Sequence, residues 1–172
     1  MSKHGKLIEP NTLQFERLLP GPIERVWEMI VDEEKRSLWF AGGPTDLKPG
    51  GVMKLNFNNS QFSPPDPAPE KFKEFGDGFE SQAIIMKCEA PTLLTINWEN
   101  GIVTFELEKQ GAEVKFTLTH EKLPAVKEQR VGTLAGWHTH LGVLADRLEG
   151  KQPDKFWPTH GRLEKEYNQL ID

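Results

Sequence analysis

Residues 126–149 read VKEQRVGTLAGWHTHLGVLADRLE, and this stretch decides the fold. Its apolar residues recur with the 3.6-residue period of an α-helix. One face carries Leu134, Trp137, Leu141, Leu144 and Leu148. Gly150 follows directly, as is typical of a residue that ends a helix. We therefore predict one long amphipathic helix whose apolar face packs on the rest of the chain.

The residues before this helix predict antiparallel strands. Asn100-Gly101 is a strong hairpin signal because both residues tolerate the positive φ of a tight turn, and Gln110-Gly111 predicts another turn. Around these turns, apolar and polar residues alternate in the segments 94–98, 103–107 and 114–120. The segments 11–19, 52–57 and 79–89 show the same alternation, so we expect at least six strands.

Two short helices are expected after the first strand. Pro22 suits the first turn of a helix, and the residues that follow place Ile23, Val26, Trp27 and Ile30 on one stripe. A second helix is expected over residues 33–39. The order of elements predicts an α+β fold, in which a curved antiparallel sheet of six to seven strands wraps around the long C-terminal helix. Such an architecture usually holds a pocket.

The segment 58–78 interrupts the sheet pattern. Its four prolines exclude a regular strand or helix at Pro64, Pro65, Pro67 and Pro69. Its aromatic residues are Phe62, Phe72 and Phe75. We predict an ordered insertion that passes over the surface of the domain or over a pocket mouth. In the tail, residues 151–172, a short helix is expected over 161–170.

Composition narrows the possible partners. The formal net charge of −5 and the scattered Lys and Arg residues argue against nucleic-acid binding. No apolar run is long enough to span a membrane or to form a signal peptide, so we expect a cytoplasmic protein.

A single cysteine, Cys88, excludes an internal disulfide. An exposed sheet edge would permit a homodimer, but nothing requires one, so a monomer or a homodimer is expected.

An ordered set of short motifs resembles a known family. The set comprises RLLPGPIERVW at 17–27, LWF at 38–40, Gly50-Gly51, APTL at 90–93, Trp98 and Gly136-Trp137. Together they resemble the START-like (SRPBCC) superfamily, in the branch named after the C-terminal domain of the activator of heat-shock protein 90 ATPase. The resemblance implies a helix-grip fold. We expect a single START-like domain over 1–172, with its core at 11–150.

The resemblance also implies a choice of functions. We expect non-enzymatic binding of a small hydrophobic or amphipathic molecule between the sheet and the long helix. One alternative is a co-chaperone-like protein that acts on a heat-shock protein 90 type ATPase in the stress response. That alternative expects an exposed apolar patch that includes Phe72, Phe75 or Trp157. A second alternative is an enzyme similar to polyketide cyclases or hydratases that uses His120. We expect no cofactor.

The candidate ligand-binding residues are mainly aromatic, as the wall of a small-molecule cavity requires. They are Trp39, Phe57, Phe79, Trp98, Phe105, Phe116, His120, Trp137 and Leu141. The competing interpretation is that these side chains simply fill the core.

Three histidines lie in predicted elements: His120 in the last strand, and His138 and His140 in the long helix. His120 is in phase with the apolar residues of its strand, so its imidazole should point inward as a polar anchor or bond to the backbone at the sheet edge. His138 and His140 point about 200° apart on a helix, and we expect His138 to cap the apolar stripe and His140 to be solvated. A site that joins His120 and His138 with a carboxylate is possible but lacks the spacing typical of metal ligands. No metal site is expected.

Overall fold

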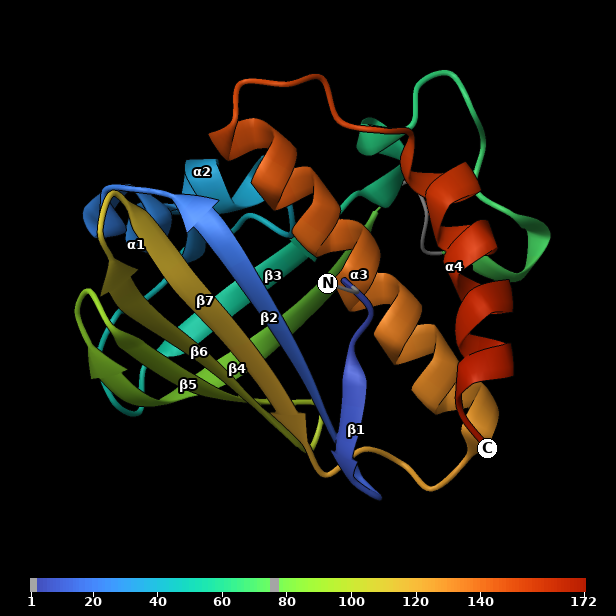
Figure 1. The fold of residues 1–172 in the computed structure, drawn as a ribbon, viewed down its shortest axis with the longest axis horizontal. Coiled ribbons are helices and arrows are strands. Elements are labelled where there is room, and N and C mark those ends of the chain that lie inside the picture. The colour runs from blue at the N-terminus through green and yellow to red at the C-terminus, as the bar shows by residue number, and fades with distance from the viewer. Residues whose placement is uncertain (1–2, 75–77) are drawn as a thin grey trace.

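The structure is a computed structural model that describes residues 3–74 and 78–172. Within them, seven strands form one antiparallel sheet in the order β1-β2-β7-β6-β5-β4-β3 (Figure 1). The strands are β1 (Lys6–Glu9), β2 (Thr12–Pro20), β3 (Val52–Phe57), β4 (Phe79–Glu89), β5 (Leu93–Trp98), β6 (Gly101–Gln110) and β7 (Glu113–Glu121). The helices are α1 (Ile23–Val31), α2 (Glu33–Ser37), α3 (Lys127–Leu148) and α4 (Phe156–Leu170), with 3₁₀ turns η1 (Asn59–Phe62) and η2 (Glu70–Phe72).

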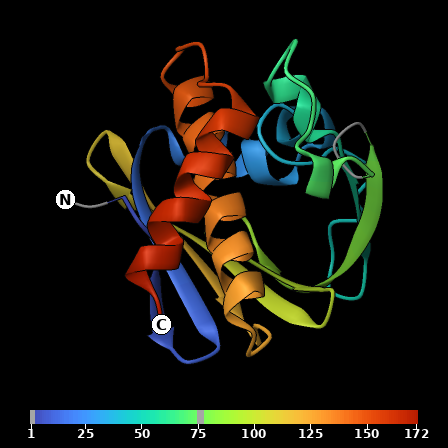
Figure 2. The same cartoon turned by 90° about the vertical axis from the view of Figure 1, so that its right-hand side faces the viewer.

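The sheet curves around α3, which lies across its concave face (Figures 1 and 2). Alternate strand residues face the helix because side chains in a strand point to opposite faces in turn. Phe105 of β6 and Phe116 of β7 are buried in this way, and Leu134 and Leu141 of α3 pack into the same core. This arrangement confirms the predicted α+β helix-grip fold, with two short helices after the first long strand.

Two elements differ from the sequence prediction. The hairpin strand β1 was not expected, and it pairs with β2 so that Leu7 lies opposite Leu13. Its four residues are mostly exposed, so the alternation that reveals a strand is absent. Helix α4 begins at Phe156, five residues before the predicted start at Gly161. Pro158 fits there because the first helical turn does not use its backbone N–H groups.

The insertion 58–78 is ordered where it is described. Residues 64–69, which hold the four prolines, form neither helix nor strand, and η1 and η2 flank them. Residues 75–77, with Phe75, lie outside the described residues.

The insertion packs on α4 through Trp157. The backbone N–H of Trp157 donates to Ser63 Oγ (3.3 Å), and its indole N–H donates to Ser60 Oγ (3.1 Å). Phe72 stacks on the Trp157 ring at a centroid distance of 5.7 Å. Lys71 Nζ adds an ion pair to Glu164 at 2.7 Å. The insertion and the tail therefore form one layer on the domain.

A buried arginine fixes the loop after α2. Arg36 is 1% exposed, and no carboxylate within the described chain pairs with it. Its guanidinium donates to the carbonyl oxygens of Ala41 (2.7 Å), Gly43 (2.9 Å), Lys54 (3.1 Å), Ile30 (3.3 Å) and Val31 (3.4 Å). Burial lowers the pKa of Arg36 to about 10, so the group remains charged at neutral pH. One side chain thus joins α1, the loop and β3.

No helix in the described part of the chain has both the length and the apolar character needed to cross a bilayer.

A candidate ligand-binding pocket between the sheet and helix α3

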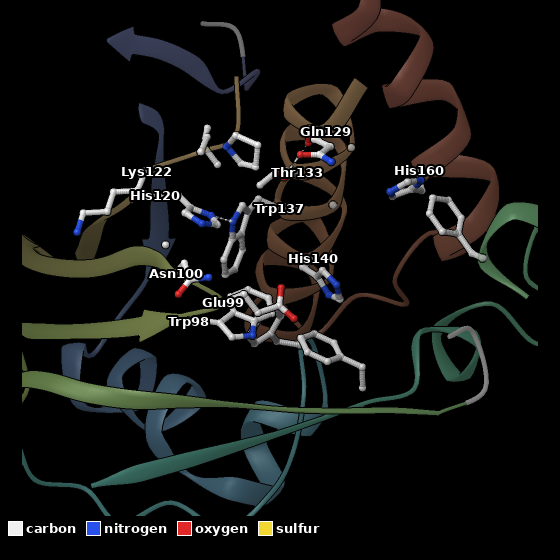
Figure 3. Close-up of a pocket in the computed structure, with 18 residues that line it drawn as sticks. Trp98, Glu99, Asn100, His120, Lys122, Gln129, Thr133, Trp137, His140 and His160 are labelled. Atoms are coloured by element: carbon white, nitrogen blue, oxygen red, sulfur yellow. Dashed lines mark hydrogen bonds between the residues drawn. The ribbon is translucent and has the colours of Figure 1, made fainter. Parts of the chain in front are cut away.

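A pocket of about 610 Å³ opens between the ends of β5 and β7, the N-terminal half of α3 and the insertion (Figure 3). Its volume falls in the range of small-molecule sites. The walls are mainly apolar and are formed by Phe40, Phe57, Phe72, Trp98, Glu99, Asn100, Gly101, His120, Lys122, Leu123, Pro124, Gln129, Gly132, Thr133, Gly136, Trp137, His140 and His160.

One wall of the pocket is a set of packed aromatic rings. Phe40 stacks on Trp137 at a centroid distance of 5.0 Å and meets Trp98 edge-on at 5.8 Å. Phe57 stacks on Trp98 at 5.7 Å. Arg36 holds the loop that carries Phe40, so this wall is built on a fixed backbone. Phe40 and Trp137 are each 3% exposed, whereas Trp98 is only partly buried and is the ring of this wall that is most open to a ligand.

Glycines form the wall on the side of α3. Gly132 and Gly136 are four residues apart, so they lie on the same face of the helix. Apart from its sequence neighbours and the backbone of its own helix turn, a Cβ added at either position would meet no atom within 4 Å. A glycine inside a helix costs about 0.5–1 kcal/mol relative to alanine. The helix therefore gives up stability at the two positions where a side chain would enter the pocket.

His120 is held in one tautomer by Trp137. The indole N–H of Trp137 donates to His120 Nδ1 at 2.9 Å (Figure 3). Because an indole nitrogen can only donate, Nδ1 must be the acceptor and the proton of the neutral ring is on Nε2. Burial lowers the pKa of His120 to about 4. At neutral pH the ring is therefore an uncharged donor.

His140 lies in the core beside the pocket, so the prediction that it is solvated was wrong. The side chain is 5% exposed, and its Nδ1 lies 2.8 Å from the carbonyl oxygen of Trp39. Since a carbonyl only accepts, Nδ1 carries the proton. Burial lowers the pKa of His140 to about 4, against the raising effect of the bond to Trp39. The helical pattern missed this because it counts histidine as polar.

Acid should weaken the fold through these two rings. The pKa of His120 and of His140 is about 4 when folded and about 6.5 when unfolded, so the unfolded chain takes up protons first. The contribution of the two neutral rings to the free energy of unfolding is therefore complete above pH 6.5 and is lost as the pH falls towards 4. Between pH 7 and pH 5 we expect the free energy of unfolding to fall by about 2 kcal/mol for each ring.

Urea denaturation at the two pH values measures this loss. The His140→Gln variant lacks one of the two rings, so its stability should fall less between pH 7 and pH 5. If the variant lost as much stability between pH 7 and pH 5 as the original protein does, His140 would not be a source of the acid sensitivity.

Of the nine candidate residues, the structure brings four together in the pocket: Phe57, Trp98, His120 and Trp137. Trp39, Phe105, Phe116 and Leu141 are buried in the core and do not line it, and Phe79 is a partly buried residue beside Phe57. Sequence reasoning missed the rim residues Glu99 and Lys122 and the glycines of α3. The i, i+4 spacing of Gly132 and Gly136 was the available signal.

His138 belongs to a different cluster, on the side of α3 that faces α4. Its Nδ1 lies 2.7 Å from the Tyr167 hydroxyl, which also accepts from the backbone N–H of Gly5 (2.7 Å). His138 thus ties α3 to α4, in place of the capping role expected from the sequence, and it does not meet His120. Across the described ranges, no group of three or more His, Cys, Asp or Glu side chains is placed to hold a metal ion.

The fold and the pocket define a class, the helix-grip proteins that leave a cavity between the sheet and the long helix. Within this class, the chain belongs to the Activator of Hsp90 ATPase homolog 1-like family, whose model matches residues 20–149. This confirms the resemblance seen in the sequence motifs. No curated protein matches the chain significantly.

Solved structures agree with this assignment. The protein encoded by gene BPP1335 from Bordetella parapertussis is 36% identical, with a TM-score of 0.82 over 99% of this chain and 91% of that one. CalU16 from Micromonospora echinospora is 22% identical, with a TM-score of 0.67 over 92% and 84%. EF2215 from Enterococcus faecalis, a conserved protein of unknown function, is 16% identical, with a TM-score of 0.67 over 98% and 91%. The last two show a shared fold alone.

Proposed function

We propose that the protein binds a small apolar or amphipathic molecule in this pocket without transforming it. The observation that carries the proposal is the pair of glycines on α3, Gly132 and Gly136, which line the pocket together with the aromatic rings. A domain that needed only a filled core would place side chains at Gly132 and Gly136 and gain helix stability. Affinity would come from apolar burial, worth about 25 cal/mol per Å² before ordering costs.

The state of His120 supports binding over catalysis. Its pKa of about 4 makes it a weak base at neutral pH. Its hydrogen-bond partner is Trp137, an indole that cannot take up a proton, and not a carboxylate. A cyclase-like or hydratase-like reaction that uses His120 would require turnover that is lost in a His120→Ala variant.

Mass spectrometry of the freshly purified protein tests the proposal. The mass is measured under native and under denaturing conditions. We expect a discrete additional mass above 19.6 kDa that disappears on denaturation. A single mass of 19.6 kDa in both conditions, together with no uptake of added apolar probes, would remove the proposal.

The insertion is expected to act as a lid. Phe72 lines the pocket, yet it is only partly buried, and its ring stacks on Trp157. Phe62, in contrast, is buried in the core. We therefore expect Phe72→Ala to weaken ligand binding several-fold while it changes the free energy of unfolding by less than about 1 kcal/mol.

Phe62→Ala is the matched comparison. It should cost about 3–5 kcal/mol of stability, as is usual for a buried phenylalanine. Ligand titration and urea denaturation of both variants check the difference. Equal losses of stability would contradict a lid role for Phe72.

A second candidate is a co-chaperone-like activity, which the family description favours. The exposed patch expected for it is not formed by Trp157, which is 7% exposed, or by Phe72, which packs on that ring. Ile84 and Met86 are exposed apolar residues on β4 and provide a different surface. Stimulation of a heat-shock protein 90 type ATPase, reduced in an Ile84→Ser/Met86→Ser variant, would support this activity.

A further inference from the structure

The pocket contains a hydrogen-bond donor with no partner in the part of the chain that the structure describes. His120 Nδ1 accepts from Trp137, so the second ring nitrogen, Nε2, carries the proton. No side chain or backbone atom among the described residues accepts from it. Among the described residues, Asn59 Oδ1 is the one side-chain nitrogen or oxygen that is both fully enclosed and without a partner. His120 Nε2 has no partner but is not such an enclosed atom, so it is not sealed in the core. The N–H is therefore open to a ligand.

The absence of a side chain at Gly101 leaves space beside His120 Nε2. The residue lines the pocket beside His120, and a Cβ at this position would lie 2.7 Å from His120 Nε2. Any other residue would therefore push the imidazole away. The hairpin glycine and the indole of Trp137 together fix where the N–H points.

Three histidines line the pocket, and burial lowers the pKa of each. Besides His120, its walls hold His140, which is neutral and bonded to Trp39, and His160, whose pKa is lowered by burial against the raising effect of Glu164. The charged residues that line it are Glu99 and Lys122, which follow the ends of β5 and β7. Both side chains are exposed to solvent, so a ligand carboxylate or ammonium that lies deeper in the pocket than Glu99 and Lys122 would lose its hydration and gain no counter-ion.

We infer that the ligand is an uncharged, flat molecule that presents a hydrogen-bond-accepting oxygen, such as a ketone carbonyl, to His120 Nε2. This inference rests on the proposed function and specifies its ligand class. The flat body lies against Trp98, the partly buried ring of the aromatic wall, and the oxygen meets the free donor. A molecule of the same shape without the oxygen leaves the donor unpaired, and this loss sets the selectivity.

Three naphthalenes of nearly equal shape test the inference. 2-Acetylnaphthalene has the carbonyl, 2-isopropenylnaphthalene replaces it by a methylene group, and 2-naphthoate carries a charge. Binding is followed by the fluorescence of the pocket tryptophans at pH 7.5. We expect 2-acetylnaphthalene to bind about tenfold more tightly than the isopropenyl analogue and also more tightly than 2-naphthoate.

A His120→Asn variant serves as the matched control. The asparagine oxygen can replace Nδ1 as acceptor for Trp137, while nothing takes the position of Nε2. In this variant the two uncharged probes should bind within about twofold of each other, and the isopropenyl analogue should bind as it does to the original protein.

The outcomes separate the two proposals. If none of the probes binds, small-molecule binding in the pocket itself fails. Two results would overturn the inferred ligand class while leaving small-molecule binding in the pocket supported. In the first, the acetyl and isopropenyl compounds bind equally; in the second, 2-naphthoate binds most tightly. A preference for the acetyl compound that survives in His120→Asn would remove His120 as its source.

Discussion

Replacing Arg36 by methionine should lower the free energy of unfolding by about 3–5 kcal/mol. The guanidinium donates to five backbone carbonyl oxygens from three parts of the chain, and it is 1% exposed. Methionine fills much of the same volume but donates to none of them. The carbonyls would remain buried without partners, which costs free energy for each one. Urea denaturation at pH 7 measures the loss.

Two further variants test the reason for that loss. Arg36→Lys keeps the charge but cannot reach several carbonyls at once, so it should recover only a small part of the stability. Lys48→Met removes an exposed cation, which pairs with Asp46 at 3.5 Å, and should change the free energy of unfolding by less than about 0.5 kcal/mol. If Arg36→Lys were as stable as the original protein, charge and not hydrogen bonding would explain the role of Arg36.

Replacing Gly136 by leucine should weaken ligand binding by about 10- to 100-fold. The new side chain would extend from α3 into the pocket, where a Cβ meets open space. Ligand and leucine would then compete for one volume. The substitution should not lower the stability of helix α3, because leucine has a higher helix propensity than glycine. Titration with 2-acetylnaphthalene and urea denaturation give the two quantities, which should change in opposite directions.

Gly142 provides the control on the same helix. A Cβ added at Gly142 likewise meets no atom beyond its own helix turn within 4 Å, but Gly142 does not line the pocket. Gly142→Ala and Gly136→Ala should both stabilise the protein by up to about 1 kcal/mol. Only the change at Gly136 should reduce affinity, and by less than leucine does. Unchanged binding in Gly136→Leu would show that the ligand lies elsewhere.

Alternation and helical period are enough to predict most of this fold. They locate the strands on either side of Asn100-Gly101 and the helix Lys127–Leu148 because one face of each is buried in a shared core. The strand β1 escapes the same reasoning because three of its four residues are exposed. The predicted start of α4 lay five residues too late, after Pro158, although the first turn of a helix accepts proline.

The candidate site was less predictable than the fold. Phe116 and Trp98 both point inward, and the alternation of a strand cannot distinguish a core residue from a pocket residue. The difference arises on the facing helix, where Leu134 and Leu141 fill space and Gly132 and Gly136 leave it open. The buried position of His140 depends on a bond to Trp39, about a hundred residues away in the sequence, which no local pattern contains.

The layer formed by the insertion and α4 has a consequence for the evolution of the family. Trp157 is bonded and stacked against the insertion, and Glu164 pairs with Lys71. A chain that lost the insertion would expose this tryptophan, and a chain that lost the tail would uncover Phe72. Neither segment is easily gained or lost alone, so we expect the two to be inherited together. An alignment of family members that differ in length would show whether the two segments appear and disappear as a pair.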